Sequence, residues 1–63
     1  MEKKMQRLLA EYGDWEGVAK ALGYKPRNLR QFRYSGHYPL WVQKHINDHI
    51  RLLEIRDGIL PDP

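Results

Sequence analysis

The side chains best suited to specific hydrogen bonding gather between Tyr24 and Gly36, in the run YKPRNLRQFRYSG. Arginine presents a fork of N–H donors, and asparagine and glutamine each present a donor beside an acceptor. Such groups form paired hydrogen bonds with planar partners such as carboxylates, phosphates or nucleic-acid bases. Leu29 and Phe32 are the only aliphatic or phenyl side chains of the run. The segment is therefore rich in groups for external contacts and poor in groups for a core.

Basic residues are concentrated in the middle of the chain, although the formal net charge is only +3. Between Gly17 and Asn47 there are six Lys or Arg residues and no Asp or Glu, whereas the flanking segments hold five basic and all eight acidic residues. This segregation favours a polyanionic partner, because each nucleic-acid phosphate that a protein neutralises releases condensed counterions. The alternative, a solvated charged face, usually mixes both signs.

The length of 63 residues predicts one small domain, too small for an elaborate enzyme cleft. We therefore expect no enzyme activity, no cofactor and no small-molecule ligand. The absence of cysteine excludes a disulfide framework and a thiolate zinc site. No apolar run approaches the roughly 20 residues of a membrane span, and the N-terminus lacks the apolar centre of a signal peptide. We expect a cytoplasmic protein without a membrane partner.

The first half of the chain predicts two helices. One apolar stripe at helical spacing marks the first helix, which ends at Gly13; its members are Met1, Met5, Leu8 and Tyr12. Asp14 is the predicted N-cap of the second helix, which Gly23 stops. The inward side of the second helix consists of Val18, Ala19 and Leu22.

A third helix is predicted from Pro26 to about Tyr34, because proline is preorganised for the first helical position. A fourth is predicted at about 39–56, followed by a short C-terminal tail, 58–63, that is mobile or lies across a partner. No strand-like alternation occurs. The sequence thus predicts an all-α fold, a compact bundle of four to five helices in which residues 1–57 form the domain.

The second and third predicted helices, at about 15–36, have the arrangement of a helix-turn-helix. This unit resembles that of the phage Cro and CI repressor superfamily in three features. Ala19 is the small residue where the two helices cross, and Gly23 is the glycine in the turn. The four apolar positions are Val18, Leu22, Leu29 and Phe32. Trp15 stands where the family often has Gln, and Lys25-Pro26 replaces a frequent Ser or Thr cap. The resemblance implies a lambda-repressor-like fold and a small Cro-like transcriptional regulator.

In a helix-turn-helix protein the recognition helix enters the DNA major groove. A rotation of about 100° per residue places the polar side chains of the third helix opposite Leu29 and Phe32, with Asn28 flanking. The predicted base-reading residues are Arg27, Asn28, Arg30 and Gln31. The predicted phosphate-contacting residues are Lys20, Lys25, Arg33, Tyr34, His37, Tyr38 and Lys44.

The last predicted helix carries two apolar arcs, and a helix packed on one neighbour needs only one. We assign the first arc, Val42, Ile46, Ile50 and Leu53, to the core. The second arc is the predicted interface of a homodimer, made by Trp41, His45, Leu52 and Ile55. Alternatively, the first helix covers both arcs. His45 and His49 have the spacing of a metal-binding pair, but no third ligand is evident, so we expect no metal site.

The sequence therefore favours a DNA-binding regulator, a phage or prophage Cro-like repressor that binds a pseudo-palindromic double-stranded DNA operator as a homodimer in a bacterial host cell. A small autoregulatory repressor, such as an anti-CRISPR-associated regulator or an antitoxin, fits the same residues. A helical interaction module that binds an acidic protein surface is the alternative from a different class. Single-stranded RNA binding is disfavoured, because the chain lacks an evident exposed aromatic platform.

Overall fold

The computed structural model describes residues 1–61, and this part of the chain contains four α-helices and no β-strand. The helices are α1 (Glu2–Tyr12), α2 (Trp15–Leu22), α3 (Pro26–Ser35) and α4 (Leu40–Arg56). The predicted all-α bundle is confirmed. Within the described residues, no helix combines the length and the apolar character needed to cross a lipid bilayer.

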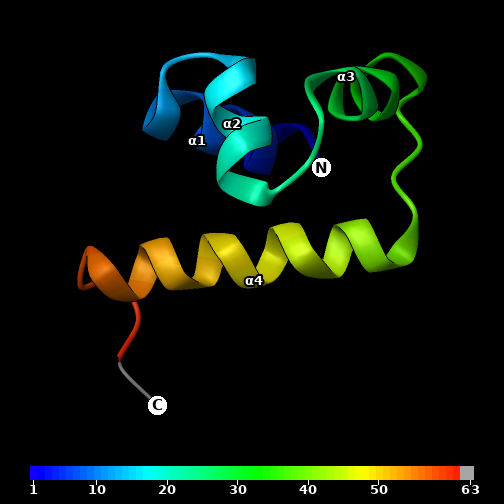
Figure 1. The fold of residues 1–63 in the computed structure, drawn as a ribbon. Coiled ribbons are helices and arrows are strands. Elements are labelled where there is room, and N and C mark those ends of the chain that lie inside the picture. Colours follow the sequence, from blue (N-terminus) through cyan, green and yellow to red (C-terminus); the bar gives the residue numbers. More distant parts are fainter. Residues whose placement is uncertain (62–63) are drawn as a thin grey trace.

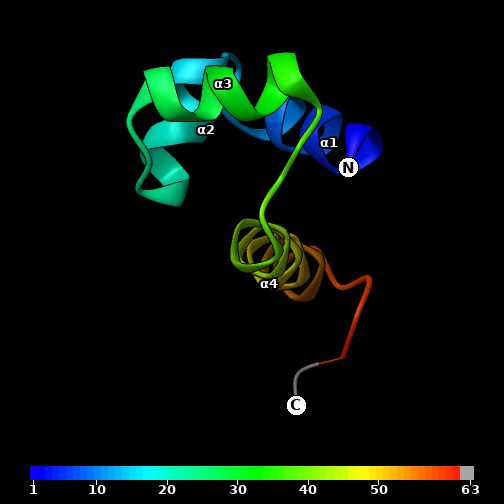
Figure 2. The same cartoon turned by 90° about the vertical axis from the view of Figure 1, so that its right-hand side faces the viewer.

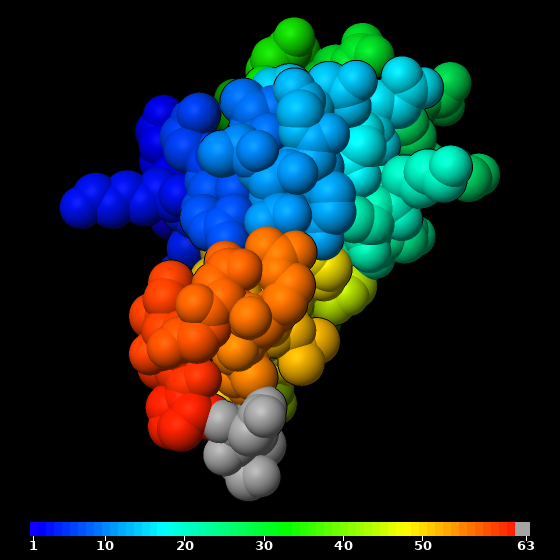
Figure 3. Space-filling model, turned by 90° about the vertical axis from the view of Figure 1, so that its left-hand side faces the viewer, coloured from blue at the N-terminus to red at the C-terminus, as the bar shows by residue number. Residues whose placement is uncertain are grey.

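The long helix α4 forms one side of the molecule, and the other three helices lie together on the opposite side (Figure 1). α1 packs against α2 and α4, and α2 also contacts both α3 and α4. α3 lies away from α4 in both ribbon views (Figures 1 and 2). In the space-filling view, α1 rests directly on the C-terminal part of α4 (Figure 3). The reading helix predicted from the sequence is therefore attached to the scaffold mainly through α2.

The corner between α1 and α2 is tightly built. The Asp14 carboxylate accepts a hydrogen bond of 2.7 Å from the backbone N–H of Gly17, which confirms Asp14 as the N-cap of α2. A Cβ atom on Gly17 would lie 3.0 Å from the backbone oxygen of Tyr12 and 3.0 Å from Asp14 Oδ1. Glycine at this position thus allows the end of α1 and the start of α2 to approach each other.

The turn between α2 and α3 is set by Gly23, which has a left-handed backbone with φ 82°. The Gly23 N–H donates to the Lys20 carbonyl at 3.2 Å, and the Tyr24 N–H donates to the Ala19 carbonyl at 2.8 Å. These two bonds form a Schellman motif, which satisfies carbonyls at the helix end. The motif directs the chain into the short connection before Pro26.

The boundaries of the last two helices differ slightly from the prediction. α3 extends one residue further, to Ser35, before Gly36 closes it. α4 begins at Leu40 rather than at residue 39, because Pro39 has the extended conformation of an N-cap, with φ −54° and ψ 153°.

The predicted tail, 58–63, begins as a closed helix end. The Ile59 N–H donates to the Glu54 carbonyl at 2.9 Å, and Gly58 has φ 79°. These features tie the first residues after α4 back to its last turn. Asp62 and Pro63 lie outside the described residues, so the expectation for the end of the tail is not addressed.

One hydrophobic core joins all four helices. Its buried members are Met5, Leu8, Val18, Ala19, Leu22, Leu29, Val42, Ile46, Ile50 and Leu53. All four residues of the first arc of the last helix are among them, as the sequence predicted. α3 contributes a single buried residue, Leu29. The core thus holds α3 along one narrow edge and leaves the rest of its surface outside.

Candidate nucleic-acid interface

The inner edge of α3 is held by Leu29 and Phe32. Leu29 is only 1% exposed, and Phe32 is half-buried against the core. The Phe32 ring lies 6.4 Å from the ring of Tyr24 in an edge-to-face arrangement and 6.1 Å from the ring of Tyr38. These aromatic contacts come from the turn before α3 and the linker after it. They fix the rotation of α3 about its own axis.

The outer edge of α3 presents the four predicted base-reading residues together. These residues are Arg27, Asn28, Arg30 and Gln31, and all four side chains are exposed. Within residues 1–61, none of the four side chains forms a hydrogen bond or an ion pair with another residue. An unpaired guanidinium can donate two parallel hydrogen bonds to O6 and N7 of guanine, and a Gln or Asn amide can bind adenine in the same bidentate way. The arrangement therefore offers donors and acceptors that the fold does not use.

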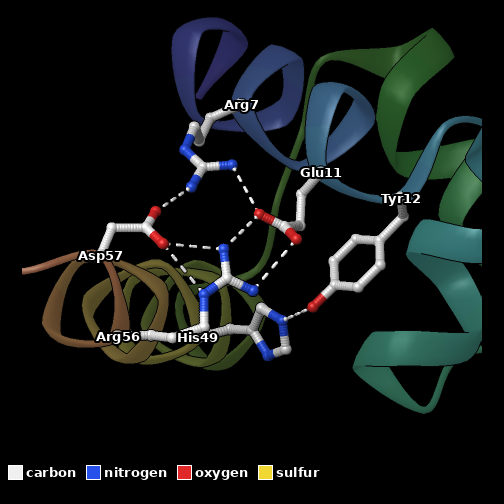
Figure 4. A network of polar contacts seen from close by, with 6 residues as sticks. All are labelled: Arg7, Glu11, Tyr12, His49, Arg56 and Asp57. Atoms are coloured by element: carbon white, nitrogen blue, oxygen red, sulfur yellow. Dashed lines mark hydrogen bonds and ion pairs between the residues drawn. The ribbon is translucent and has the colours of Figure 1, made fainter.

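Ion pairing within the described chain is confined to the opposite end of the molecule. Arg7 and Arg56 both contact Glu11 and Asp57, at distances between 2.8 and 3.1 Å (Figure 4). Hydrogen bonds from Arg56 and Arg7 lower the pKa of Glu11 from 4.5 to about 2. The same contacts raise the pKa of Arg56 above its ordinary value.

These pairs neutralise arginines outside the cationic middle of the chain. Between Gly17 and Asn47, by contrast, the structure records no ion pair for any Lys or Arg residue. The separation of basic from acidic residues along the sequence is therefore also found in three dimensions. The basic side chains without an ion pair in this segment lie on and around α3.

Most of the predicted phosphate-contacting residues are exposed. Lys20 and Lys25 line a shallow hollow on α2 and the start of α3, which also includes acidic Asp14 and Glu16. The side chain of Tyr34 is 80% exposed at the C-terminal end of α3. His37 in the linker and Lys44 on α4 are also exposed. The set is thus distributed over α2, α3, α4 and the two connections between them rather than over α3 alone.

Arg33 and Tyr38 are half-buried, unlike the other members of that set. The Arg33 guanidinium stacks over the Trp15 ring, 3.7 Å from its centroid, in a cation–π contact. Burial raises the pKa of Tyr38. Both residues line a pocket of about 420 Å³ between the start of α1 and the end of α3. The contact between Trp15 and Arg33 was not predicted, because no local pattern connects residues on two different helices.

The predicted dimer residues divide into an exposed pair and a partly engaged pair. Trp41 is 63% exposed and Leu52 is 65% exposed. Ile55 is half-buried, and His45 Nδ1 shares a hydrogen bond of 2.6 Å with the Tyr24 hydroxyl. α1 therefore does not cover this arc, although the sequence left that arrangement open.

The two histidines of α4 contact tyrosines rather than a common centre. The Tyr12 hydroxyl lies 2.5 Å from His49 Nε2, and the Tyr24 hydroxyl bonds to His45. Burial, followed by the neighbouring His45, lowers the pKa of His49. Among residues 1–61, no three His, Cys, Asp or Glu side chains gather closely enough to hold a metal ion.

Comparisons with known proteins identify no relative of this chain. No protein-family model matches the chain, and no curated protein or solved structure matches it.

Proposed function

We propose that this chain is a sequence-specific, double-stranded DNA-binding transcriptional regulator whose α3 enters the major groove. The observation that carries the proposal is the outer edge of α3, where four hydrogen-bonding side chains are exposed and have no partner within the described residues. Leu29 and Phe32 hold the opposite edge on the scaffold. A rigid helix with free donors and acceptors along one edge is what direct readout of base pairs requires.

Arg27, Arg30 and Gln31 are the leading base-reading residues, and Asn28 flanks them. Each good bidentate contact discriminates against the wrong base by about 1–3 kcal/mol. The exposed lysines around α3 contact backbone phosphates, which set the position of the helix without reading sequence. Arg33, stacked on Trp15, offers a preordered guanidinium for the same purpose.

The resemblance of residues 15–36 to phage Cro and CI repressors makes a Cro-like repressor the specific form of the proposal. One module of this size buries on the order of 600–1,000 Å² on DNA, so specific binding generally needs two copies. We therefore include a homodimer that reads a pseudo-palindrome with half-sites about one helical turn apart. A phage or prophage origin and a bacterial cytoplasm belong to the same proposal.

The test is selection of binding sites from random duplex DNA with the purified chain, followed by the variants Arg27→Ala and Arg30→Ala. Arg51→Ala is the matched control, because Arg51 is an exposed arginine on α4. We expect a two-fold symmetric site, with base preference changed at particular positions by the α3 variants and unchanged by the control. Uniform weakening without altered preference would refute base reading by Arg27 and Arg30 and leave them as phosphate contacts.

The salt dependence of binding separates this function from the interaction module. A regulator that neutralises several phosphates loses affinity steeply between about 50 and 200 mM salt and prefers one short sequence. Failure to bind any duplex, combined with capture of an acidic protein, would replace the proposal with the interaction module.

A further inference from the structure

We propose that the pocket between α1 and α3 binds a free amino acid with a large apolar side chain. The pocket has a volume of about 420 Å³, within the range of roughly 300–1,000 Å³ that is typical of small-molecule sites. Its walls come from the first three helices and the linker before α4. Because these segments are far apart in the sequence, no local pattern connects them, and a small-molecule ligand was not expected from the sequence.

The pocket lies where the fold leaves two helices unjoined. α3 packs on α2, whereas α1 packs on α2 and α4, and the backbones of α1 and α3 do not approach each other closely. The N-terminal end of α1 nevertheless lies near α3 in both ribbon views (Figures 1 and 2). Met5, a buried core residue, lines the pocket, so the pocket reaches the edge of the core. A ligand held there would contact both helices.

Arg33 supplies the pocket with a cation that the fold does not neutralise. Arg7 and Arg33 are the half-buried arginines of residues 1–61. Arg7 forms ion pairs with Glu11 and Asp57, but Arg33 has none within the same residues. One face of the Arg33 guanidinium rests on the Trp15 ring. Stacking uses this face, while the N–H groups at the edge of the guanidinium can bind a carboxylate.

Glu2 supplies the opposite charge to the same pocket. It lies in the first turn of α1, lines the pocket and forms no ion pair with any residue that the structure describes. The Tyr38 hydroxyl senses both charges, because burial raises the pKa of Tyr38, Arg33 lowers it and Glu2 raises it. Glu2 and Arg33 thus lie near one hydroxyl group without pairing with each other.

These two charges match the zwitterion of an α-amino acid. The carboxylate of the ligand would bind the edge of the Arg33 guanidinium, and its ammonium group would bind the Glu2 carboxylate. The ligand side chain would then lie among the apolar surfaces of Met5, Trp15 and Tyr38. A ligand with only one of the two charges would leave Glu2 or Arg33 beside it without a partner, which costs binding free energy.

The aromatic walls are held in place by the fold itself. The Tyr38 ring lies 6.1 Å from the Phe32 ring, and the Gln43 amide donates a hydrogen bond of 2.7 Å to the Tyr38 carbonyl. Trp15 is held by its contact with Arg33. A preformed pocket lowers the cost of ordering on binding. With the average binding free energy per atom of drug-sized ligands, phenylalanine would have a dissociation constant of roughly 2 mM.

The experiment is a titration of the full chain with phenylalanine, followed by NMR of the indole N–H groups. The chain has two tryptophans: Trp15 lines the pocket, and Trp41 lies outside it on α4. The variant Trp41→Phe assigns the two signals. We expect a saturable shift of the Trp15 signal and no shift of the Trp41 signal. An unmoved Trp15 signal, or equal shifts of both signals, would overturn the proposal.

Two analogues that each lack one charge test the class of ligand. Phenylpropionate has no ammonium group, and phenylethylamine has no carboxylate. We expect each to bind about tenfold more weakly than phenylalanine, since each loses one charge-assisted hydrogen bond. If either analogue binds as tightly as phenylalanine, the ligand is not recognised as a zwitterion and the proposal is wrong.

Two variants assign each charge of the ligand to its residue. Arg33→Gln should weaken phenylalanine and phenylpropionate by about tenfold and leave phenylethylamine unchanged. Glu2→Gln should weaken phenylalanine and phenylethylamine and leave phenylpropionate unchanged. The probe that each variant still binds shows that the variant is folded. A similar loss of all three probes would contradict these assignments.

The matched controls carry the same substitutions outside the pocket. Arg51→Gln changes an exposed arginine on α4, and Glu16→Gln changes an acidic residue in the first turn of α2. Both should bind all three probes as the unmodified chain does, and a control that loses binding as Arg33→Gln does would refute the site. No measurement contains DNA. A chain that fails to bind any duplex therefore leaves this site intact, and a chain that binds DNA but not phenylalanine loses this site alone.

Discussion

Replacing Leu29 with alanine removes the one fully buried side chain by which α3 is attached to the core. Leu29 is 1% exposed, so the substitution leaves an internal cavity rather than a surface gap. Buried Leu→Ala substitutions cost about 2–5 kcal/mol, and we expect about 3 kcal/mol here, because α3 packs mainly on α2 and can shift to fill part of the space. A chain of this length has a free energy of unfolding of roughly 3–9 kcal/mol.

The loss is measured by urea denaturation followed by circular dichroism. With a urea dependence of about 1 kcal/mol per molar, the midpoint should fall by roughly 3 M. Leu40→Ala is the control, because Leu40 is the same residue type and its side chain is 80% exposed. It should change the free energy of unfolding by less than about 0.5 kcal/mol.

A loss below about 1 kcal/mol for Leu29→Ala, or an equal loss for both variants, would contradict the attachment of α3 through Leu29. DNA binding provides a second readout. It is measured without urea, at a temperature at which the variant is still folded. There, a mobile α3 should bind any duplex more weakly, since its orientation must be fixed on binding.

Two further predictions concern the caps and charges that hold α1, α2 and α4. Asp14→Ala should lower the free energy of unfolding by about 1 kcal/mol, because the Gly17 N–H loses its acceptor, while Asp14→Asn should retain most of it; chemical denaturation of both variants measures the difference. Glu11 has a pKa of about 2 in the folded chain against 4.5 ordinarily, so the unfolded chain binds more protons between these values. Its contribution to stability is present above pH 4.5 and is lost as the pH falls towards 2. Glu11→Gln should therefore flatten the fall in stability over that window, and an unchanged pH profile would show that Glu11 is not responsible.

Much of the helical framework follows from residues with a local effect. Asp14 as a cap, Gly23 and Gly36 as left-handed stops, and Pro26 as a helix start act within one turn of the chain, so they can be recognised in sequence. The one-residue error at the start of α4 also has a local cause. Pro39 can serve as the first helical residue or as the extended residue before it, and its φ is compatible with both.

The inward and outward edges of α3 were also predictable, because helical periodicity separates Leu29 and Phe32 from the polar residues. Contacts between distant segments were not. Arg33 stacks on Trp15, and Tyr24 contacts His45, through the packing of separate helices, which one sequence does not encode in any spacing. For the same reason, the sequence did not indicate that Arg33 is half-buried whereas Arg30 is exposed.

The position of Tyr24 bears on how the proposed dimer would match an operator. Its ring touches Phe32 on one side and Trp41 and His45 on the other, so it joins the start of α3 to the start of α4. In the proposed dimer, the size of this side chain would help set how far apart the two copies of α3 stand. A smaller or larger residue there would change the preferred number of base pairs between half-sites while leaving the bases read by each copy the same.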